Sequence, residues 1–502
     1  MIHFKCIMPF NSLKYFLFLP VVYLAFYFVS ERARWCVLLT ASLLFYASLN
    51  LPYLLVVLIL VAMTTYGFGI WLYQTTTPKV KLALLWSGIA VNVLILVVMK
   101  YLPFLSENLK ALFTLFSIDV HVQIINAFAA IGVSFYVFQA ISYLLDIYLE
   151  KEKPERHFGY FALYLAFFPK LVQGPIERSA DLIPQLKTQY KFNYNNMRSG
   201  MLLFTWGLFK KVVIADRLGI FTNNVYDNVH SYQGLPLLIA TYFYAFQIYM
   251  DFSGYTDMAI GSARLFNINL SRNFNSPYLA TSVIDFWRRW HITFSRWILD
   301  YIFKPLQMQW RNWKHWGTAA ALIVTFLISG IWHGASWGFV IWGGLHGLFM
   351  ACSVIYKPYQ QKLHKALGIE KSRLLKVMQI IVTFHLVCFA WIFFRAKGLN
   401  DAWYVVTHLL RPVAADARYE TSNDYLIQKI LMGQPREFFI VLLSLVTTVA
   451  VSFVVNRDEN NSLSVFWERR SLPVRWGLYV SLVLSIIVFA VYESSTFIYY
   501  QF

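Results

Sequence analysis

The histidine at position 333 is the residue whose type and setting best suit chemistry. It lies in a stretch from His315 to Tyr356 that contains no Asp, Glu, Lys or Arg. That stretch is long enough to cross a bilayer twice, since one crossing takes about 20 apolar residues. An ionisable side chain at membrane depth is costly and usually faces a cavity where it serves a function. Its neighbours Trp332 and Gly334 offer a ring that can wall a pocket and a glycine that lets another group come close.

The chemistry that suits such a histidine is acyl transfer to oxygen. Burial favours the neutral form of an imidazole, and a neutral imidazole can take the proton of a hydroxyl that attacks an acyl carbonyl. The reaction otherwise needs an acyl thioester and a route for both substrates. The alternative role for His333 is structural, a hydrogen bond that fixes two membrane helices together. The residues alone weigh the two roles about equally.

A second imidazole, His291, lies in a segment that is amphipathic and too charged to span a membrane. In residues 271–305, charged and aromatic side chains alternate: Asp285, Arg288, Arg289 and Arg296 with Phe286, Trp287, Trp290 and Trp297. This pattern is typical of an interfacial helix. Its arginines would also suit an anionic donor such as the phosphates of coenzyme A. We expect this segment to approach the region of His333 from the cytoplasm.

The composition indicates a membrane protein. Hydrophobic residues make up 58% of the chain and charged residues only 14%, whereas a soluble domain has about a quarter charged residues. The net charge of +18 could suggest nucleic-acid binding, but the basic residues lie in loops between apolar runs. Orientation in a membrane explains them better, and we expect no nucleic-acid partner.

The apolar runs predict about twelve membrane spans. They lie near 13–29, 35–50, 51–73, 80–101, 124–149, 198–216, 235–265, 318–334, 336–355, 374–394, 438–456 and 476–493. A further apolar piece, 158–174, contains Pro169, Lys170 and Gly174 near its end and is interpreted as re-entrant, because broken backbone at membrane depth must line a protein cavity. No internal repeat is evident, which weakens a transporter interpretation based on inverted repeats.

The loop charges predict the orientation of the spans. Basic residues at 32 and 34, at 79 and 81, from 151 to 156, from 264 to 314 and from 357 to 376 indicate cytoplasmic connections. No Lys or Arg occurs between Arg217 and Arg264, so the loop near Asp227 should be extracytoplasmic. Both termini are then expected on the periplasmic side. The nearly charge-balanced stretch 395–437 leaves its side open.

Six pieces of the chain carry long motifs in a fixed order: 10–28, 131–148, 167–178, 244–280, 285–306 and 329–347. They resemble the membrane-bound O-acyltransferase family, in the branch of bacterial alginate O-acetyltransferase and related polysaccharide and cell-wall O-acyltransferases. The resemblance implies one all-α polytopic domain over 1–502, with a family-like core at about 10–395 and less characteristic C-terminal helices at 396–502. It also implies 11–12 transmembrane helices, with re-entrant and interfacial helices, around a central tunnel between a cytoplasmic donor and an outer acceptor.

The same resemblance assigns residue roles. His333, in W-H-G, matches the family's catalytic histidine, and His291, in W-R-R-W-H, matches a second characteristic position with a supporting role in donor binding or positioning. The substrate or tunnel candidates are Trp287, Arg288, Arg289, Trp290, Trp332, Asp251, Tyr255, Lys170 and Gln173, with Glu177 and Asp257 in matching motifs. For the polar candidates outside 285–306, a structural hydrogen bond is the favoured alternative. His346 and His385 are interpreted as packed core residues, and no histidine spacing indicates a metal site.

The function expected from these features is membrane-bound O-acyl transfer, most simply O-acetyl transfer. The donor would be a cytoplasmic thioester, acetyl-CoA or an acylated carrier protein, with no bound cofactor. The acceptor would be an exported polysaccharide or cell-wall glycan outside the bacterial inner membrane, reached with a periplasmic serine-hydrolase-like (SGNH-type) partner. The alternatives are D-alanyl or lipid O-acyl transfer and, outside enzymes, a transporter. The acceptor, the oligomeric state and the start codon (Met1 or Met8) are not determined by the sequence.

Overall fold

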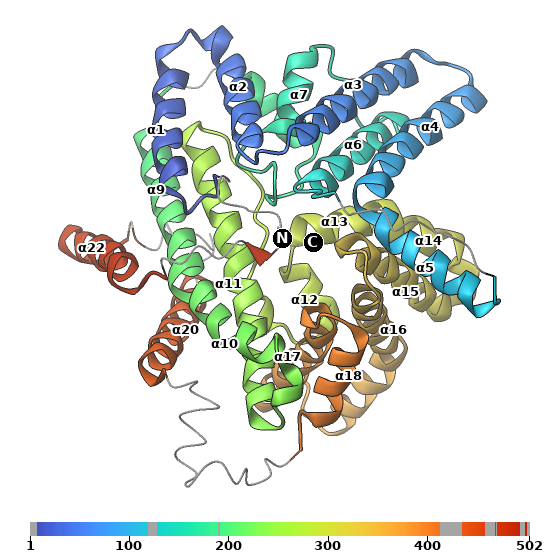
Figure 1. The fold of residues 1–502 in the computed structure, drawn as a ribbon, viewed down its shortest axis with the longest axis vertical. Coiled ribbons are helices and arrows are strands. Elements are labelled where there is room, and N and C mark those ends of the chain that lie inside the picture. The colour runs from blue at the N-terminus through green and yellow to red at the C-terminus, as the bar shows by residue number, and fades with distance from the viewer. Residues whose placement is uncertain are drawn as a thin grey trace. The chain divides into compact units, whose positions relative to one another are not determined.

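The computed structural model describes residues 8–118, 128–188, 191–411, 434–456, 467, 469–491 and 497–498. Within these ranges every regular element is a helix (Figure 1), which confirms the predicted all-α class. The chain divides into two compact units, one formed by 1–204 with 255–272 and the other by 205–254 with 273–501. The prediction of a single domain over 1–502 stays a prediction.

The first unit contains the N-terminal helices. They are α1 (Leu13–Phe28), η1 (Glu31–Ala33), α2 (Arg34–Ala47), α3 (Pro52–Gln74), α4 (Pro78–Leu96), η2 (Val97–Tyr101), α5 (Leu102–Leu115), α6 (Val133–Tyr148), α7 (Phe158–Ala166), α8 (Ser179–Lys187) and most of α9 (Tyr194–Phe209). Helix α7 ends at Ala166, and irregular but buried backbone follows as far as Gly174. This is the broken, buried backbone that the sequence predicted for 158–174.

The second unit contains the helices that carry both candidate histidines. They are η3 (Lys210–Ala215), α10 (Asp216–Tyr226), η4 (Val229–Ser231), the first part of α11 (Leu235–Leu265), η5 (Pro277–Leu279), α12 (Val283–Arg289), α13 (Ile292–Ile298), η6 (Leu299–Phe303), α14 (Lys304–Gln309), η7 (Arg311–Trp313), α15 (Lys314–His333), α16 (Trp337–Ala366), α17 (Arg373–Arg395), α18 (Leu399–His408), α20 (Pro435–Asn456) and α22 (Leu472–Phe489).

Within the described residues each of the twelve predicted spans contains a helix, and six helical stretches there are long and apolar enough to cross a membrane. These six are Pro52–Gln74, Pro78–Leu115, Arg311–His333, Trp337–Ala366, Arg373–Arg395 and Leu472–Phe489. Helices α1, α2 and α6 have 16, 14 and 16 residues, short of the roughly 20 that a perpendicular crossing takes. The helix in the predicted span 124–149 begins at Val133, later than expected. Residues 124–127 of this span lie outside the described part of the chain.

Helices α15 and α16 form a tightly packed antiparallel hairpin in the second unit (Figure 1). The backbones approach closely at two glycines. A Cβ at Gly330 would lie 2.3 Å from the carbonyl oxygen of Phe339, and a Cβ at Gly343 would lie 2.2 Å from that of Phe326. Small residues at helix contacts allow this approach in membranes. The hairpin thereby fixes His333, the last residue of α15, against the first turns of α16.

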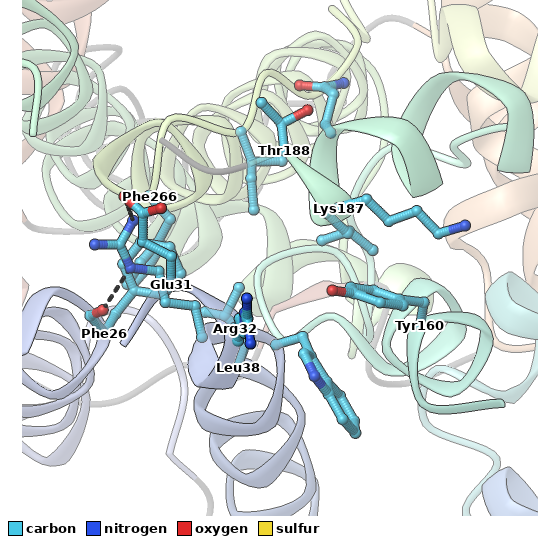
Figure 2. Close-up of a pocket in the computed structure, with 13 residues that line it drawn as sticks. Phe26, Glu31, Arg32, Leu38, Tyr160, Lys187, Thr188 and Phe266 are labelled. Atoms are coloured by element: carbon cyan, nitrogen blue, oxygen red, sulfur yellow. Dashed lines mark hydrogen bonds and ion pairs between the residues drawn. The ribbon is translucent and has the colours of Figure 1, made fainter. Parts of the chain in front are cut away.

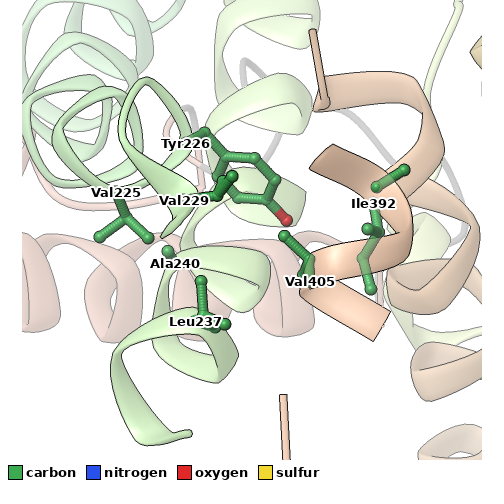
Figure 3. Close-up of a cluster of buried hydrophobic side chains, with 8 residues drawn as sticks. Val225, Tyr226, Val229, Leu237, Ala240, Ile392 and Val405 are labelled. Atoms are coloured by element: carbon green, nitrogen blue, oxygen red, sulfur yellow. The ribbon is translucent and has the colours of Figure 1, made fainter. Parts of the chain in front are cut away.

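A buried apolar cluster anchors α18 to the loop that follows α10 (Figure 3). Its members are Val225, Tyr226, Val229, Leu237, Ala240, Ile392, Ala402 and Val405. Two ion pairs accompany this packing. Asp227 Oδ1 lies 3.5 Å from Arg395 Nη2 and 3.1 Å from Lys397 Nζ. The beginning of the stretch 395–437 therefore lies on the same side as the Asp227 loop. The loop charges alone had not determined this side. Residues 412–433 lie outside the described part.

The second unit also buries a shared charge cluster. The Nζ atom of Lys211, in the π-helix η3, lies 2.7 Å from a carboxylate oxygen of Asp216 and 2.7 Å from one of Asp251. The other oxygen of Asp251 accepts the backbone N–H of Ile498 at 3.0 Å, and Nζ lies 4.3 Å from the centre of the Phe497 ring. One cation thus compensates two buried carboxylates, which makes its removal costly.

Candidate functional site

His333 lies in a cage of aromatic rings. Its imidazole centre is 4.7 Å from the ring of Trp332 and 4.8 Å from that of Trp342, and it lies 5.7 Å from Phe294 and 5.5 Å from Phe394. Only 4% of the residue is exposed. Such a buried aromatic setting suits an imidazole that acts as a general base. Gly334 follows at the point where the chain leaves α15, and the ring of Phe339 occupies the space that a Cβ there would need.

His291 joins the same aromatic cluster. Phe294 is 5.0 Å from the His291 ring and Trp332 is 6.2 Å from it, and both of these rings also contact His333. The structure therefore brings the two predicted histidines together. Burial lowers the pKa of His291 to about 3, so its imidazole is neutral throughout the physiological pH range.

The backbone at His291 explains how it reaches that position. The predicted amphipathic segment 271–305 is not one surface helix: α12 and α13 are short, and His291 between them adopts a left-handed conformation with φ 43° and ψ 54°. Such a conformation costs on the order of 1–3 kcal/mol in a residue other than glycine and clusters at functional sites. Much of the segment is buried. The segment therefore forms two short helices joined at His291, with buried aromatic side chains on both sides of it, and its interfacial position stays a prediction.

A cavity of about 530 Å³ adjoins this cluster within the second unit. It is lined by Ile284, Trp287, Arg288, Ile292, Ser295, Arg296, Ile298, Leu299, Phe303, Thr318, Leu322, Thr325, Phe326, Met350 and Val354. Its chemistry is mixed: two exposed guanidinium groups, from Arg288 and Arg296, accompany a largely apolar wall. A thioester donor whose phosphates are anionic and whose arm is extended would match both parts.

The cavity runs along the hairpin towards His333. Its lining residues on α15 extend from Thr318 to Phe326, which corresponds to ~12 Å of helix, and His333 follows ~10 Å further along the same face. The cavity begins near the hairpin end that carries Lys314 and Lys357, the end expected in the cytoplasm. His333 does not line this cavity, so the predicted tunnel through the protein stays a prediction.

The other candidates in 285–306 divide between the cavity and the core. Trp287 and Arg288 line the cavity. Arg289 instead forms an ion pair with Asp285, its Nε lying 2.9 Å from the carboxylate. Trp290 is buried in the aromatic core, with Phe274 at 5.1 Å among its ring neighbours. Neither Arg289 nor Trp290 lines the cavity that the other two face.

The predicted polar candidates outside 285–306 mostly have structural partners. Asp251 pairs with Lys211, and Tyr255, in the first unit, stacks on Phe10 at 4.6 Å. Lys170 donates to the side-chain oxygen of Gln139. These contacts agree with the structural role that the sequence analysis favoured for such residues.

Two further polar candidates of the first unit behave differently from each other. Glu177 accepts from the hydroxyl of Ser271 at 2.9 Å, a structural contact like those of the other polar candidates. Gln173 has a carboxamide that is buried and has no hydrogen-bond partner in the described part of the chain. It is therefore the candidate of this unit with polar atoms still available.

Two residues that sequence reasoning set aside or missed belong to the site. His346, expected in the core, is fully buried, and its Nδ1 accepts the indole N–H of Trp287 at 3.2 Å. Trp342 lies between the two histidines of the hairpin, with its ring centre 4.8 Å from His333 and 5.0 Å from His346. The only sequence signal was the helical spacing of Trp342 and His346 on one face of α16.

Comparison with known proteins identifies the family. The description of the matching family is membrane-bound O-acyltransferase, and it covers residues 156–394. A peptidoglycan O-acetyltransferase of Helicobacter pylori is 36% identical over 80% of this chain and 79% of its own length. A probable alginate O-acetylase of Azotobacter vinelandii is 34% identical over 77% of this chain and 75% of its own. A teichoic acid D-alanyltransferase of Bacillus subtilis is 27% identical over 55% of this chain.

The chain belongs to the membrane-bound O-acyltransferase family. It is therefore an acyltransferase and a multi-pass membrane protein, as the sequence resemblance implied. The matched region contains α12 to α16 and the whole His291–His333 cluster. Family membership indicates the reaction class, whereas the mechanism has to be inferred from the geometry of these residues.

A serine in this O-acyltransferase lies in a pattern known from other acyl-transfer enzymes. Residues 334–338 read GASWG, which matches the G-x-S-x-G nucleophile elbow of α/β-hydrolases. That motif requires a strand before the serine. Here Ser336 follows helix α15 and is the N-cap of α16, with its hydroxyl accepting the N–H of Gly338 at 3.3 Å. The pattern is explained by helix capping.

A smaller cavity of about 130 Å³ lies in the first unit of this O-acyltransferase (Figure 2). Arg32, Arg34, Tyr160 and Lys187 are among its lining residues. Figure 2 shows the Tyr160 hydroxyl pointing into this space, while the amino group of Lys187 points away from it. None of the predicted site residues lines this cavity, so we do not include it in the candidate site.

The left-handed backbone at His291 allows the effect of a substitution on folding to be tested separately from its effect on activity. Asparagine tolerates the left-handed conformation well, so His291→Asn should fold normally and lower acyl transfer roughly tenfold to a hundredfold through lost positioning. His291→Val should also lose stability, because a β-branched residue disfavours this conformation. Thermal unfolding in detergent and acyl transfer in membranes measure the two effects. Full activity in His291→Asn would contradict a role for the imidazole.

Proposed function

We propose that this protein takes acetyl groups from a cytoplasmic thioester, most simply acetyl-CoA, and passes them to a hydroxyl of an exported polysaccharide or cell-wall glycan. The observation that carries the proposal is the cavity with two arginines that runs along α15 towards His333. Its relatives add support, because they are named for O-acetylation of peptidoglycan and alginate. The proposed location is a bacterial inner membrane, with both termini on the periplasmic side.

His333 is the proposed general base. The caged, neutral imidazole would take the proton of the acceptor hydroxyl while the oxygen attacks the thioester carbonyl. The tetrahedral intermediate would then expel the thiolate, which takes up a proton and leaves as free thiol. His291 is in ring contact with Phe294 and Trp332 of the same cage. It would hold these rings in position relative to the bound donor.

The enzyme and transporter interpretations differ in one product. A transporter would move glycan or donor without cleaving a thioester, whereas the proposed reaction releases one thiol for each acyl group transferred. Free thiol measured after adding labelled acetyl-CoA to proteoliposomes of the purified protein, with acceptor glycan and the proposed periplasmic partner present, should therefore rise with time and with protein. Transfer that depends on an acylated carrier protein, with no free coenzyme A released, would instead favour a carrier-protein donor.

The two arginines of the cavity should act on donor binding. A charge-assisted hydrogen bond contributes about 1.5–3 kcal/mol, so Arg288→Gln and Arg296→Gln should each raise KM for acetyl-CoA roughly tenfold or more. The KM for acetyl-pantetheine, which lacks the phosphates, should not change. Arg289→Gln is the matched control, because this arginine pairs with Asp285 outside the cavity. Equal effects on both donors would contradict phosphate binding at the cavity.

The acceptor step is proposed to involve a second protein. A periplasmic, serine-hydrolase-like acetyltransferase (SGNH-type) could receive the acetyl group on its serine and then modify the glycan. Deleting such a protein while keeping this one should stop both thiol release from acetyl-CoA and glycan acetylation, because the serine that accepts the acetyl group is then missing.

D-alanyl transfer is the second candidate, because relatives named as teichoic acid D-alanyltransferases match this chain at 27% and 25% identity. Those relatives match only 55% of the chain, against 77–80% for the O-acetylation relatives. The second candidate predicts an aminoacyl donor. A D-alanyl thioester that competes poorly with acetyl-CoA would favour the acetyl donor.

A further inference from the structure

Between the cavity and His333 lies a short stretch of the hairpin that the proposed reaction must use. Phe326 is the last cavity residue on α15, and His333 follows seven residues later on the same helix face, ~10 Å away. The acyl group of a donor in the cavity has to cross this distance to reach the imidazole. What occupies the stretch therefore decides which acyl groups can react.

Several buried polar atoms in this stretch have no partner in the described part of the chain. They are the hydroxyl of Ser329, the indole nitrogen of Trp342 and Nε2 of His346. Ser329 lies on α15 one turn before His333, and Trp342 contacts both His333 and His346. A buried polar atom without a partner is rare and calls for a water or a ligand. Three around one path indicate a place that binds polar atoms.

One indole closes this path on the cavity side. Trp287 lines the cavity and has its ring centre 4.8 Å from that of Phe326 and 5.7 Å from that of Trp342. Trp342 in turn contacts His333 at 4.8 Å. The side chain of Trp287 therefore contacts both the cavity and the ring that touches the imidazole.

His346 fixes the orientation of this indole. An indole N–H can only donate, so Nδ1 of His346 must accept and must be unprotonated. The neutral ring then carries its hydrogen on Nε2, the atom that lacks a partner. Phe286 stacks on the other side of the imidazole at 6.1 Å. The hydrogen bond at 3.2 Å thereby holds Trp287 in one rotamer, with His346 as a positioning residue.

We propose that the stretch between the cavity and His333 is the acyl-thioester subsite, and that Trp287, held by His346, limits the size of the acyl group that reaches His333. The proposal rests on the proposed function. A short acetyl group passes this narrow point, whereas each further methylene meets the indole. Removing the indole or releasing it from His346 should relax the selection against longer acyl groups.

The test is the acyl-chain profile of thiol release in proteoliposomes with acceptor present. Acetyl-, propionyl-, butyryl- and hexanoyl-CoA are compared as kcat/KM in the parent and in Trp287→Ala, Trp287→Phe, His346→Leu and His346→Asn. Trp287→Ala should raise the butyryl-to-acetyl ratio roughly tenfold, the scale on which pockets discriminate one or two methylenes. Trp287→Phe and His346→Leu, which remove the hydrogen bond but keep most of the volume, should raise it less.

His346→Asn is the rescue variant, because its carboxamide oxygen can still accept the indole N–H, and its ratio should stay near that of the parent. If Trp287→Ala does not fold, the contrast between His346→Leu and His346→Asn carries the test. Active variants that all keep the parental ratio would overturn the inference. A parent protein that releases no thiol from any acyl-CoA would instead overturn the proposed function, so the two failures are distinct.

Discussion

His333→Gln should lower acyl transfer by roughly 10²–10⁴-fold, the usual contribution of a general base. Glutamine has a similar size and can still form hydrogen bonds, but it cannot take a proton from the acceptor hydroxyl. The rate of thiol release from acetyl-CoA, measured with acceptor in proteoliposomes, is the readout. The aromatic cage of Trp332, Trp342, Phe294 and Phe394 should remain, so the variant should keep the thermal stability of the parent.

A matched control separates this role from a general need for histidines in the spans. His385 lies on α17, is exposed, and its Nε2 is 2.9 Å from the hydroxyl of Tyr242. His385→Gln should keep nearly full activity. A His333→Gln protein that is well folded and still transfers acyl groups at the parental rate would disprove the base. Loss of activity together with loss of folding would be assigned to stability and not to chemistry.

Lys211→Met should produce the largest loss of stability. The change leaves the carboxylates of Asp216 and Asp251 buried without their shared cation, and breaking a buried ion pair from one side costs about 3–5 kcal/mol. Thermal unfolding in detergent should therefore begin several degrees lower than in the parent. The double variant Lys211→Met/Asp251→Asn should recover part of the loss, because it removes one of the two stranded charges.

Lys304→Met is the control for this experiment. Lys304 pairs with Asp300 at 2.8 Å, but both side chains are largely exposed, and exposed pairs contribute little. Its unfolding temperature should stay close to that of the parent. If Lys211→Met unfolds at the parental temperature, the buried charge cluster does not stabilise the fold as its burial indicates.

Much of the fold was predictable because a membrane restricts the kinds of sequence that can span it. In the described part of the chain each of the twelve apolar runs contains a helix, as expected because a lipid-exposed backbone must satisfy its hydrogen bonds internally. The charge-free run around His333 and its W-H-G motif pointed to the site directly. The broken backbone after α7 followed from Pro169 and Gly174, which do not continue a helix.

The rest of the site depends on contacts that no local pattern contains. The amphipathic pattern of 271–305 did not indicate the break at His291, a left-handed residue at which two short helices meet. Arg289 pairs with Asp285 on the same helix and does not line the cavity, and its role in donor binding stays a prediction. His346 is the buried residue that the sequence indicated, but its hydrogen bond from Trp287, on which the proposed positioning role rests, had no signal in the sequence. That bond joins residues 59 positions apart, a contact that composition and periodicity do not specify.

The central claim is that an acyl group supplied on one face of the membrane is carried past His333 to a hydroxyl on the other. The most direct measurement supplies labelled acetyl-CoA to the cytoplasmic face of sealed, oriented vesicles and follows alkali-labile label on glycan at the opposite face. The account predicts label there with the parent protein and a loss of at least about a hundredfold with His333→Gln. Equal labelling with both proteins, or label confined to the face of addition, would contradict it.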